Sequence, residues 1–365
     1  MTSRIPVAVL AATGAVGQRF VSLLENHPWF QVVAVTGSER GEGRRYADVV
    51  NWVVPGEIPA SVRDLVVRPT DAGDSLGEET RLLFSALPTE IAREMEPQLA
   101  AAGYLVCSNA SALRMEPDVP LLIPEINPDH IGLIDAQRAK RGWSGLAVAA
   151  PNCATTAIIF PLRALHDAFG LVRVHVVTMQ AISGAGYPGV ASFDILDNII
   201  PYIKGEEEKI ESEPRKLLGA LKHDAIEMAD FTISAQANRV PVMDGHMGAL
   251  SVELKSEATL PDVRAVLSNW QAPESVRQLP SSPQHPMVLR DEPDRPQPRR
   301  DRDAGNGMTV SVGRVQQCSV LGFKMVSLGH NTLRGAASGA IQNAEWLAVS
   351  GYLGAFQPAV EQITA

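Results

Sequence analysis

The sequence has few cysteines and no long apolar run. Cys107, Cys153 and Cys318 are widely spaced and give neither a CxxC metal pair nor a disulfide framework, so we expect no metal site and a reducing compartment, the cytoplasm. No run of about 18 apolar residues occurs, which excludes a typical transmembrane helix. The apolar segment 5–16 follows Arg4 as in a signal peptide, but it continues into glycines and an amphipathic segment, which favours a strand and loop.

The sequence also lacks an excess of positive charge. It carries 32 Lys and Arg against 41 Asp and Glu, a net charge of −9. Such a chain has no global positive field, so we expect neither nucleic acid nor an anionic membrane as a partner. What it does have is length and apolar content, because 365 residues that are 45% hydrophobic suffice for two domains with a core each.

The first 150 residues alternate between predicted strands and helices. Apolar strand patterns occur at residues 5–10, 31–35, 82–87 and 104–107. Helical patterns lie between them at residues 18–26 and 89–102. This β-α-β alternation predicts an α/β fold with a doubly wound parallel sheet.

The pattern changes after residue 150. Residues 172–181, 309–315 and 321–328 read as longer strands with partial alternation, which predicts a second, α+β domain with a mixed sheet and helices on one face. Residues 273–307 hold seven prolines and many charges, so we expect a long irregular segment. An Ala-rich helical pattern covers residues 331–352.

A glycine turn joins the first strand to the first helix. It reads Ala11-Ala-Thr-Gly14-Ala-Val-Gly17, and glycines there let a ligand approach the backbone while the helix N-terminus offers free N–H groups to a pyrophosphate. A simple strand-to-helix connection is the alternative. The context favours a dinucleotide site formed by Thr13, Gly14, Ala15, Val16 and Gly17.

The end of the second strand indicates which dinucleotide binds. Glu39 would suit the ribose of NAD, whereas Ser38 and Arg40, with Arg44 and Arg45, supply donors for the 2′-phosphate of NADP. A solvated loop with ordinary charges is the alternative. The donor count favours NADP.

Cys153 follows Pro151-Asn152 and begins a helical pattern. At a helix N-terminus the macrodipole and free N–H groups stabilise a thiolate, so we expect a lowered pKa and a nucleophile at this position. Cys107 and Cys318 lie inside apolar runs and are better explained as structural residues.

Other residues are candidates for a site around such a thiol. Arg239 and His246 lie seven residues apart and can share a wall of the site, although a lone histidine is more often structural. Ser183-Gly184 opens a stretch of small residues where a nicotinamide ring could approach the backbone. Pro214 suits a first helical turn, so we expect Glu213 to cap a helix and Lys216 to share its side.

With these motifs the chain resembles aspartate-semialdehyde dehydrogenases of the branch typical of archaea and fungi. The matching stretches run nearly end to end: Ala12-Thr-Gly-Ala-Val-Gly17, Phe84-Ser-Ala-Leu-Pro88, Ser108-Asn-Ala110, Val119-Pro120 to Pro124-Glu-Ile-Asn127, Pro151-Asn-Cys153, Ser183-Gly-Ala-Gly186, Ile200-Pro-Tyr202, Asn238-Arg239 to Gly245-His246, Asp301 to Met308 and Asn331 to Ala337. The resemblance implies a Rossmann-type NADP-binding domain at residues 1–150 and 332–365. It implies a catalytic and dimerisation domain at 151–331, and a homodimer or homotetramer.

The resemblance also implies a reaction and its residues. L-Aspartate 4-semialdehyde, NADP and phosphate would reversibly give L-4-aspartyl phosphate and NADPH through a Cys153 thioester. The implied roles are His246 as acid and base, Gln180 for the acyl group, Arg239 for the α-carboxylate, Glu213 for the ammonium, Arg114 and Lys216 for phosphate with Asn109 beside them, and Ser85, Ser183, Gly184 and Asn331 for the cofactor.

Three positions depart from the family pattern, and rival functions remain. The departures are Ala11 in the glycine turn, Ala154 after the cysteine and Pro214 beside Glu213. A malonyl-CoA reductase or N-acetylglutamyl-phosphate reductase would share the cofactor site and the Cys-His chemistry, but Glu213 with Arg239 favours an amino-acid substrate. An idle NADP-binding scaffold is the alternative outside enzymes, against which the intact Cys153, Gln180 and His246 argue.

Overall fold

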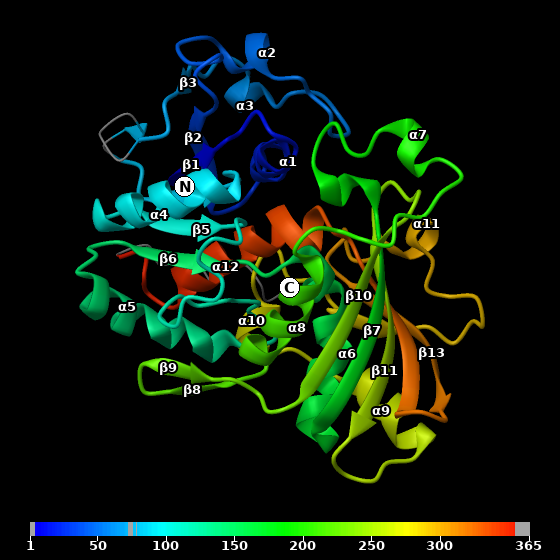
Figure 1. Ribbon diagram of the computed structural model, residues 1–365. Helices are drawn as coiled ribbons and strands as arrows, with labels where there is room; N and C mark the ends of the chain where they lie inside the picture. Colours follow the sequence, from blue (N-terminus) through cyan, green and yellow to red (C-terminus); the bar gives the residue numbers. More distant parts are fainter. Residues whose placement is uncertain (1–3, 72–75, 78, 355–365) are drawn as a thin grey trace, which may run out of the picture.

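The computed structural model describes residues 4–71, 76–77 and 79–354. Within these residues the chain forms two six-stranded sheets and a separate two-stranded hairpin, β8 (Ala220–Lys222) with β9 (Ala225–Glu227) (Figure 1). Among the helices described, none is long and apolar enough to cross a membrane.

The first sheet is parallel throughout. Its strands are β1 (Ile5–Leu10), β2 (Phe30–Thr36), β3 (Val67–Arg68), β4 (Leu82–Ser85), β5 (Leu105–Ser108) and β6 (Leu146–Ala149). Their order, β3-β2-β1-β4-β5-β6, confirms the predicted doubly wound sheet. The chain reverses its winding direction between β1 and β4, and in such sheets a ligand binds at the carboxyl ends of those two strands.

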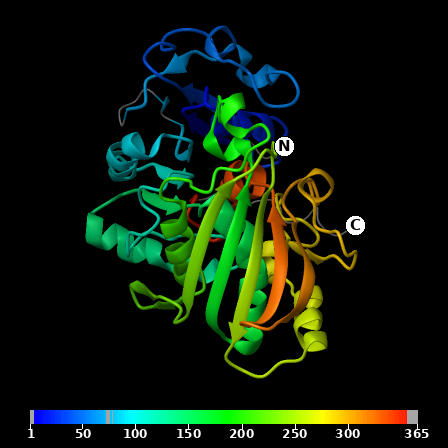
Figure 2. The same cartoon turned by 45° about the vertical axis from the view of Figure 1, so that its right-hand side comes forward.

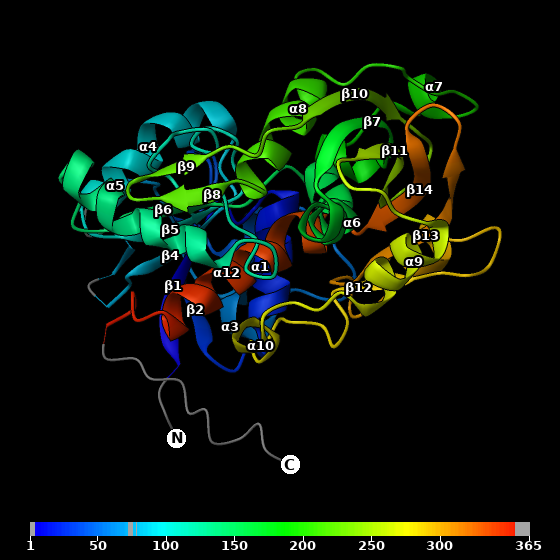
Figure 3. The ribbon, with the colours of Figure 1, turned by 90° about the horizontal axis from the view of Figure 1, so that it is seen from below.

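Helices cover both faces of this sheet because its strands are apolar on both sides. On one face α1 (Ala15–Leu24) and α12 (Ser338–Val349) pack together with α5 (Leu133–Arg141) against alternate strand residues. On the other face α4 (Thr89–Ala101) contacts β5 and β6. Figure 3 shows α12, from the end of the described chain, lying beside α1. The division at residues 150 and 332 stays a prediction, although α12 lies on the first sheet.

The second sheet is mixed, as predicted. Its strands are β7 (Leu171–Gln180), β10 (Thr232–Arg239), β11 (His246–Leu254), β12 (Met287–Leu289), β13 (Val310–Cys318) and β14 (Gly322–Gly329). The order is β10-β7-β11-β14-β13-β12, with parallel pairs at both edges and antiparallel pairs between them.

One face of this second sheet is covered and the other is open. The long helix α6 (Cys153–Phe169) packs against β11 and β14, and α9 (Leu260–Asn269) packs beside it. Figure 2 looks onto the opposite face, where no helix covers the central strands. The alternation of buried and more exposed residues along β7 and β11 follows from this one-sided packing.

The proline-rich segment 273–307 is more ordered than the sequence predicts. It contains α10 (Glu274–Arg277), the edge strand β12 and α11 (Pro298–Asp301). The buried Asp301 carboxylate accepts hydrogen bonds from Arg295 and from the Gln297 amide. The expectation of a long irregular segment holds for most of these residues, and three short elements interrupt it.

Candidate active site

A cavity of about 740 Å³ lies between the two sheets, near the carboxyl ends of β1 and β4. Segments from both halves of the chain line it: the start of α1, residues 86–89, residues 109–114, Cys153, the loop 182–189, the first turn of α8 (Glu206–Leu217), and residues 331–336. The volume suits a ligand of dinucleotide size together with a small substrate.

The glycine turn forms one end of this cavity. Ala15 and Val16 line it, whereas Thr13 and Gly14 in the turn and Gly17 in α1 are not among its lining residues. A Cβ atom at Gly17 would lie 2.3 Å from the Ala11 carbonyl oxygen, so only glycine permits this contact between helix and strand. Ala11 itself has φ +53°, a left-handed conformation that glycine adopts with less strain. Alanine in place of the family's glycine therefore costs conformational free energy at this position.

The predicted 2′-phosphate donors are at the surface beyond the lining of the cavity. Ser38 and Arg40 are exposed. Arg45 forms ion pairs with Asp48 and Asp64, so its charge is already matched. Ser85 is buried at the end of β4, where its Oγ lies 3.5 Å from the Leu87 amide that donates to it.

Cys153 is the first residue of α6 and faces the cavity. Asn152 caps the helix, since its Oδ1 accepts the amide protons of Ala154 and Thr155 at 2.8 and 3.1 Å. A Cβ atom at Gly335 would lie 2.7 Å from the Cys153 Cβ, so the backbone of residue 335 packs directly on the nucleophile candidate. The predicted position at a helix start is confirmed.

The predicted lowering of the Cys153 pKa is wrong. Burial, helped by the negative charge of Glu206, raises the pKa of the Cys153 thiol to about 12 against the opposing effect of Arg114 and Arg239. A helix N-terminus gives only part of a unit charge, and here desolvation outweighs it.

His246 begins β11 and is fully buried beside Arg239, which ends β10. Its Nδ1 accepts the Ala181 amide proton at 3.1 Å, so the neutral ring carries its proton on Nε2, which has no hydrogen-bond partner among the described residues. Burial and the nearby Arg239 lower the pKa of His246 to about 3. A Cβ atom at Gly184 would lie 2.8 Å from Arg239 Nη1 and 2.9 Å from His246 Nε2, so the loop backbone passes directly over both.

A polar network joins Gln180 to the first turn of α8. The Glu206 carboxylate accepts hydrogen bonds from Asn152 Nδ2 (2.9 and 3.0 Å) and Gln180 Nε2 (3.2 Å), and it pairs with Lys209 Nζ at 2.9 Å. Burial acts to raise the pKa of Glu206, but Lys209 and these hydrogen bonds outweigh it and the net shift is downward. Glu206 and Lys209 therefore present a carboxylate and an ammonium to the cavity, and the sequence prediction missed both.

Glu213 and Lys216 are not among the residues that line this cavity, and neither are Gln180, Arg239 and His246. The predicted substrate roles of Glu213 and Lys216 therefore stay predictions. Glu213 Oε1 accepts from Arg114 Nη1 (3.0 Å) and Oε2 accepts the Asn152 amide (2.6 Å). Lys216 Nζ donates to the carbonyls of Arg114, Glu116 and Val119 at 2.7 to 2.9 Å, which uses all three of its protons. Lys216 therefore has no proton left for a ligand, whereas each Glu213 oxygen keeps a lone pair beside its one hydrogen bond.

The predicted helix start at Pro214 is wrong. The prediction treats it as the first turn of a helix, but α8 begins eight residues earlier at Glu206, and Pro214 lies within its second half. Glu213 is therefore not a cap. The sequence holds two E-x-x-K pairs two helical turns apart, and their identical spacing hides which pair faces the cavity.

Arg114 and Asn109 do line the cavity. Arg114 Nη2 donates to the Asn109 carbonyl at 2.8 Å while Nη1 holds Glu213, so the guanidinium is fixed from two sides. The Asn109 Nδ2 group is buried without a hydrogen-bond partner among the described residues.

Asn331 forms hydrogen bonds with two loops, one containing Ser183 and the other containing Gly245. Its Oδ1 accepts the Gly245 amide proton and its Nδ2 donates to Ser183 Oγ, both at 2.8 Å. Asn331, Ser183 and Gly184 all line the cavity, at the side that faces Cys153.

Comparisons with known proteins agree with this geometry. The family profile "Semialdehyde dehydrogenase, NAD binding domain" matches residues 6–134, and "Semialdehyde dehydrogenase, dimerisation domain" matches residues 162–334. Aspartate-semialdehyde dehydrogenase from Archaeoglobus fulgidus is 49% identical over 342 residues, which cover 94% of this chain and 97% of the relative. The enzyme of the same name from Schizosaccharomyces pombe is 44% identical over 346 residues, 93% of this chain and 96% of the relative.

Solved structures lead to the same family. A crystal structure of aspartate semialdehyde dehydrogenase with NADP from Candida albicans superposes with a TM-score of 0.86 and is 39% identical, covering 94% of this chain and 98% of that one. Aspartate semialdehyde dehydrogenase II from Vibrio cholerae gives a TM-score of 0.74 at 26% identity, covering 97% and 100%. The chain belongs to the aspartate-semialdehyde dehydrogenase family.

Proposed function

We propose that this chain carries out the reaction of its family, the reversible reductive dephosphorylation of L-4-aspartyl phosphate to L-aspartate 4-semialdehyde with NADPH. One observation carries the proposal: a cysteine at the start of a buried helix shares a cavity with a glycine turn for a dinucleotide and with charges of both signs. The rival readings, a malonyl-CoA reductase or N-acetylglutamyl-phosphate reductase, are not favoured, since the relatives described above are aspartate-semialdehyde dehydrogenases.

The turn at the start of α1 fits a dinucleotide, and we assign NADP to it. The close contact at Gly17 and the free N-terminus of α1 next to Ala15 and Val16 leave room for a pyrophosphate. Exposed Ser38 and Arg40 at the end of β2 would hold the 2′-phosphate. Bound NADPH supplies a hydride to the acyl carbon, or NADP accepts it in the reverse direction.

The charges that line the cavity, together with Arg239 behind Gly184, match the substrate. Arg239 uses Nη1 to bind the Ala181 carbonyl at 2.7 Å, and a guanidinium has five N–H donors, so donors remain for the α-carboxylate. Glu206, held as a carboxylate, would bind the α-ammonium. Arg114 and Lys209 would bind the phosphate group. This assignment uses the pair one heptad before Glu213 and Lys216, whose own substrate roles stay predictions.

Cys153 would attack the acyl carbon of aspartyl phosphate and displace phosphate, giving a thioester that hydride then reduces. His246 can donate from Nε2 to the acyl oxygen, where negative charge develops on attack. Gln180, fixed by Glu206, would orient the acyl group from the same side. A full acid and base role for His246 stays a prediction, because it requires a proton to move between Nε2 and a reacting atom.

The open face of the second sheet suits a second copy of the chain. The matching family domain is a dimerisation domain, and the exposed face of β7, β11 and β14 carries small and apolar side chains next to polar ones. We propose a homodimer through this face; a tetramer and the cytoplasmic location stay predictions.

The test is NADPH formation by the purified protein with L-aspartate semialdehyde, with and without phosphate, and with NADP against NAD. We expect activity that requires phosphate and prefers NADP. Cys153→Ala should abolish it while NADPH still binds. Activity in Cys153→Ala would reject the thioester, and silence of the native protein with retained NADPH binding would reject the substrate.

A further inference from the structure

The segment that leaves the second sheet makes an unusual turn beside Cys153. After β14, residues Leu333–Ala337 form a π-helical turn in which the Gly335 amide donates to the His330 carbonyl at 3.0 Å and the Ala337 amide donates to Thr332. Single π turns are rare and are often found at functional sites. Gly335 lies against Cys153, and Asn331 just before the turn binds Ser183 and Gly245. The turn therefore backs the nucleophile and the loop next to His246 at once.

A buried ion pair fixes this turn. Arg334 Nη1 donates to Glu125 Oε1 at 2.8 Å, and Nη2 lies 2.8 Å from Oε2 of the same carboxylate. The guanidinium lies over the Phe160 ring, 4.6 Å from its centroid. Both charged side chains are only 1% exposed.

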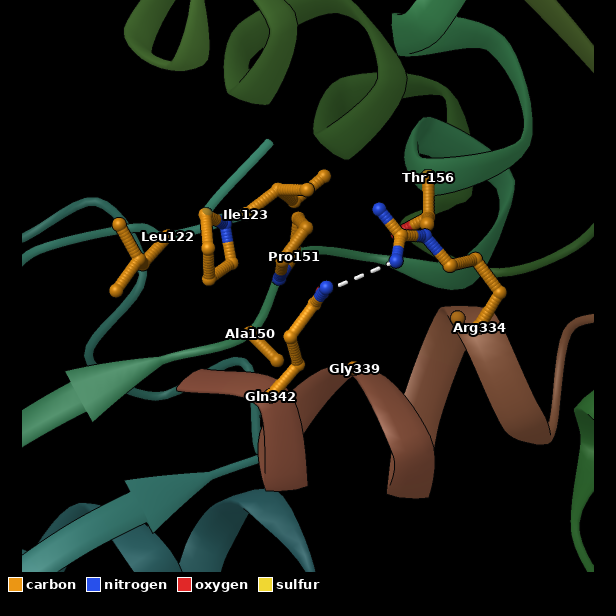
Figure 4. A pocket seen from close by; sticks show the side chains of 10 residues that line it. Leu122, Ile123, Ala150, Pro151, Thr156, Arg334, Gly339 and Gln342 are labelled. Carbon is orange, nitrogen blue, oxygen red and sulfur yellow. Dashed lines mark hydrogen bonds between the residues drawn. The ribbon is translucent and has the colours of Figure 1, made fainter. Parts of the chain in front are cut away.

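The pair joins four segments of the chain. Glu125 comes from the loop after β5, Phe160 from the helix that Cys153 begins, and Gln342 from α12. Gln342 Oε1 accepts from Arg334 at 3.0 Å, and its Nε2 donates to Glu125 Oε1 at 2.8 Å. Figure 4 shows Arg334 and Gln342 facing Pro151 and Thr156 across a cavity of only about 10 Å³. Little free space remains in which the turn could shift.

Stability is a weak explanation for such a pair. Burying two full charges is costly, and apolar residues of similar volume often stabilise a core as well or better. A planar guanidinium with one hydrogen bond and a second close ion contact to the same carboxylate, in contrast, fixes both distance and orientation. We propose that Arg334 and Glu125 are positioning residues that hold the π-helical turn, and through Gly335 the Cys153 backbone, in register with the loop that binds the nicotinamide. This inference rests on the proposed role of Cys153.

The first test is Arg334→Lys, which keeps the charge and loses the fork. We expect kcat to fall by about 10- to 100-fold, because displacement of the reacting groups by about 1 Å costs that much, while the KM for aspartate semialdehyde changes less than about threefold. The rate at which iodoacetamide alkylates Cys153, followed by mass spectrometry of its peptide, should change in parallel. Gln342→Leu, which leaves no charge unpaired, should show the same split more weakly and serves if Arg334→Lys does not fold.

Glu345→Gln is the matched control. Glu345 lies on α12, the helix that also carries Gln342. Its carboxylate forms a second buried pair with His27 Nε2 at 2.8 Å and also accepts the Ser281 amide proton. The positioning role is wrong if Glu345→Gln lowers kcat as much as Arg334→Lys does at an equal loss of thermal stability. It is also wrong if the Arg334 and Gln342 variants fold and keep the native kcat and alkylation rate. The alkylation rate needs no substrate, so it still tests the turn if the proposed reaction itself fails.

Discussion

The two ends of helix α8 carry the same chemical pair in opposite roles. Glu206 and Lys209 at its start line the cavity, and Glu213 and Lys216 two turns later are buried in contacts with the protein itself. Both pairs have the spacing that places two side chains on one helix face. What separates them is the partners that the rest of the fold supplies.

The second pair supports the first. Glu213 holds Arg114, which lines the cavity, and the Asn152 amide next to Cys153. Lys216 Nζ donates hydrogen bonds to three carbonyls of the loop that carries Arg114. The pair at the end of the helix therefore holds a loop that lines the cavity, whereas the pair at its start lines the cavity itself.

The largest effect is expected for Glu213→Gln. It leaves the Arg114 guanidinium buried without its counter-charge, which typically costs about 3–5 kcal/mol of folding free energy. Urea unfolding measures this. Glu208→Gln, at an exposed position of the same helix, should change stability by less than about 0.5 kcal/mol. Equal effects would remove the distinction between the two ends of the helix.

A slightly smaller effect concerns pH and Lys216. Burial lowers the pKa of Lys216 to about 8, below the usual lysine value of 10.5. Between these values the unfolded chain binds a proton that the folded chain has released, so the free energy of unfolding should rise with pH, by at most about 3 kcal/mol. Lys216→Met should remove this rise, and exposed Lys222→Met should keep it. A rise that persists in Lys216→Met would assign it to another group.

Much of the fold follows from local sequence patterns. The apolar runs of β1, β2, β4 and β5 and the glycine turn between β1 and α1 are local signals, and each was predicted close to its position. The strand β3, at two residues, is too short for a periodic signal and was missed. The strand β6 was missed as well, although it is as long as β4 and β5. β10 and β11 were missed as well, because they carry the polar residues of the site and interrupt the apolar alternation.

The features of the site also divide into those with a local sequence signal and those set by distant residues. The helix start at Cys153 is local and was predicted, but the pKa of its thiol depends on burial and on Glu206, fifty-three residues away, and was predicted with the wrong sign. Glu206 and Glu213 differ only in which distant groups surround them. Sequence spacing therefore identified the helix face and could not identify the turn that meets the cavity.

Glu206→Gln should lower kcat/KM for aspartate semialdehyde by about 100-fold with little loss of stability. The amide keeps the shape and can still bind Asn152, but it loses the charge that would hold the substrate ammonium. Steady-state kinetics and thermal unfolding measure the two quantities. A large loss of stability with unchanged kinetics would move Glu206 into the structural class with Glu213.

The smallest effect is expected for Lys209, and it distinguishes this lysine from the buried Lys216. Lys209 is about one-third exposed, and its Nζ has one ion-pair partner, Glu206, so it has protons left for an incoming phosphate. Lys209→Met should raise the KM for phosphate about tenfold, the size expected for one partly exposed charge contact, and leave unfolding unchanged. Lys204→Met, at an exposed position five residues earlier, is the control. If Lys209→Met leaves the KM for phosphate unchanged, the phosphate site belongs to Arg114 alone, and the start of α8 then recognises only the ammonium group.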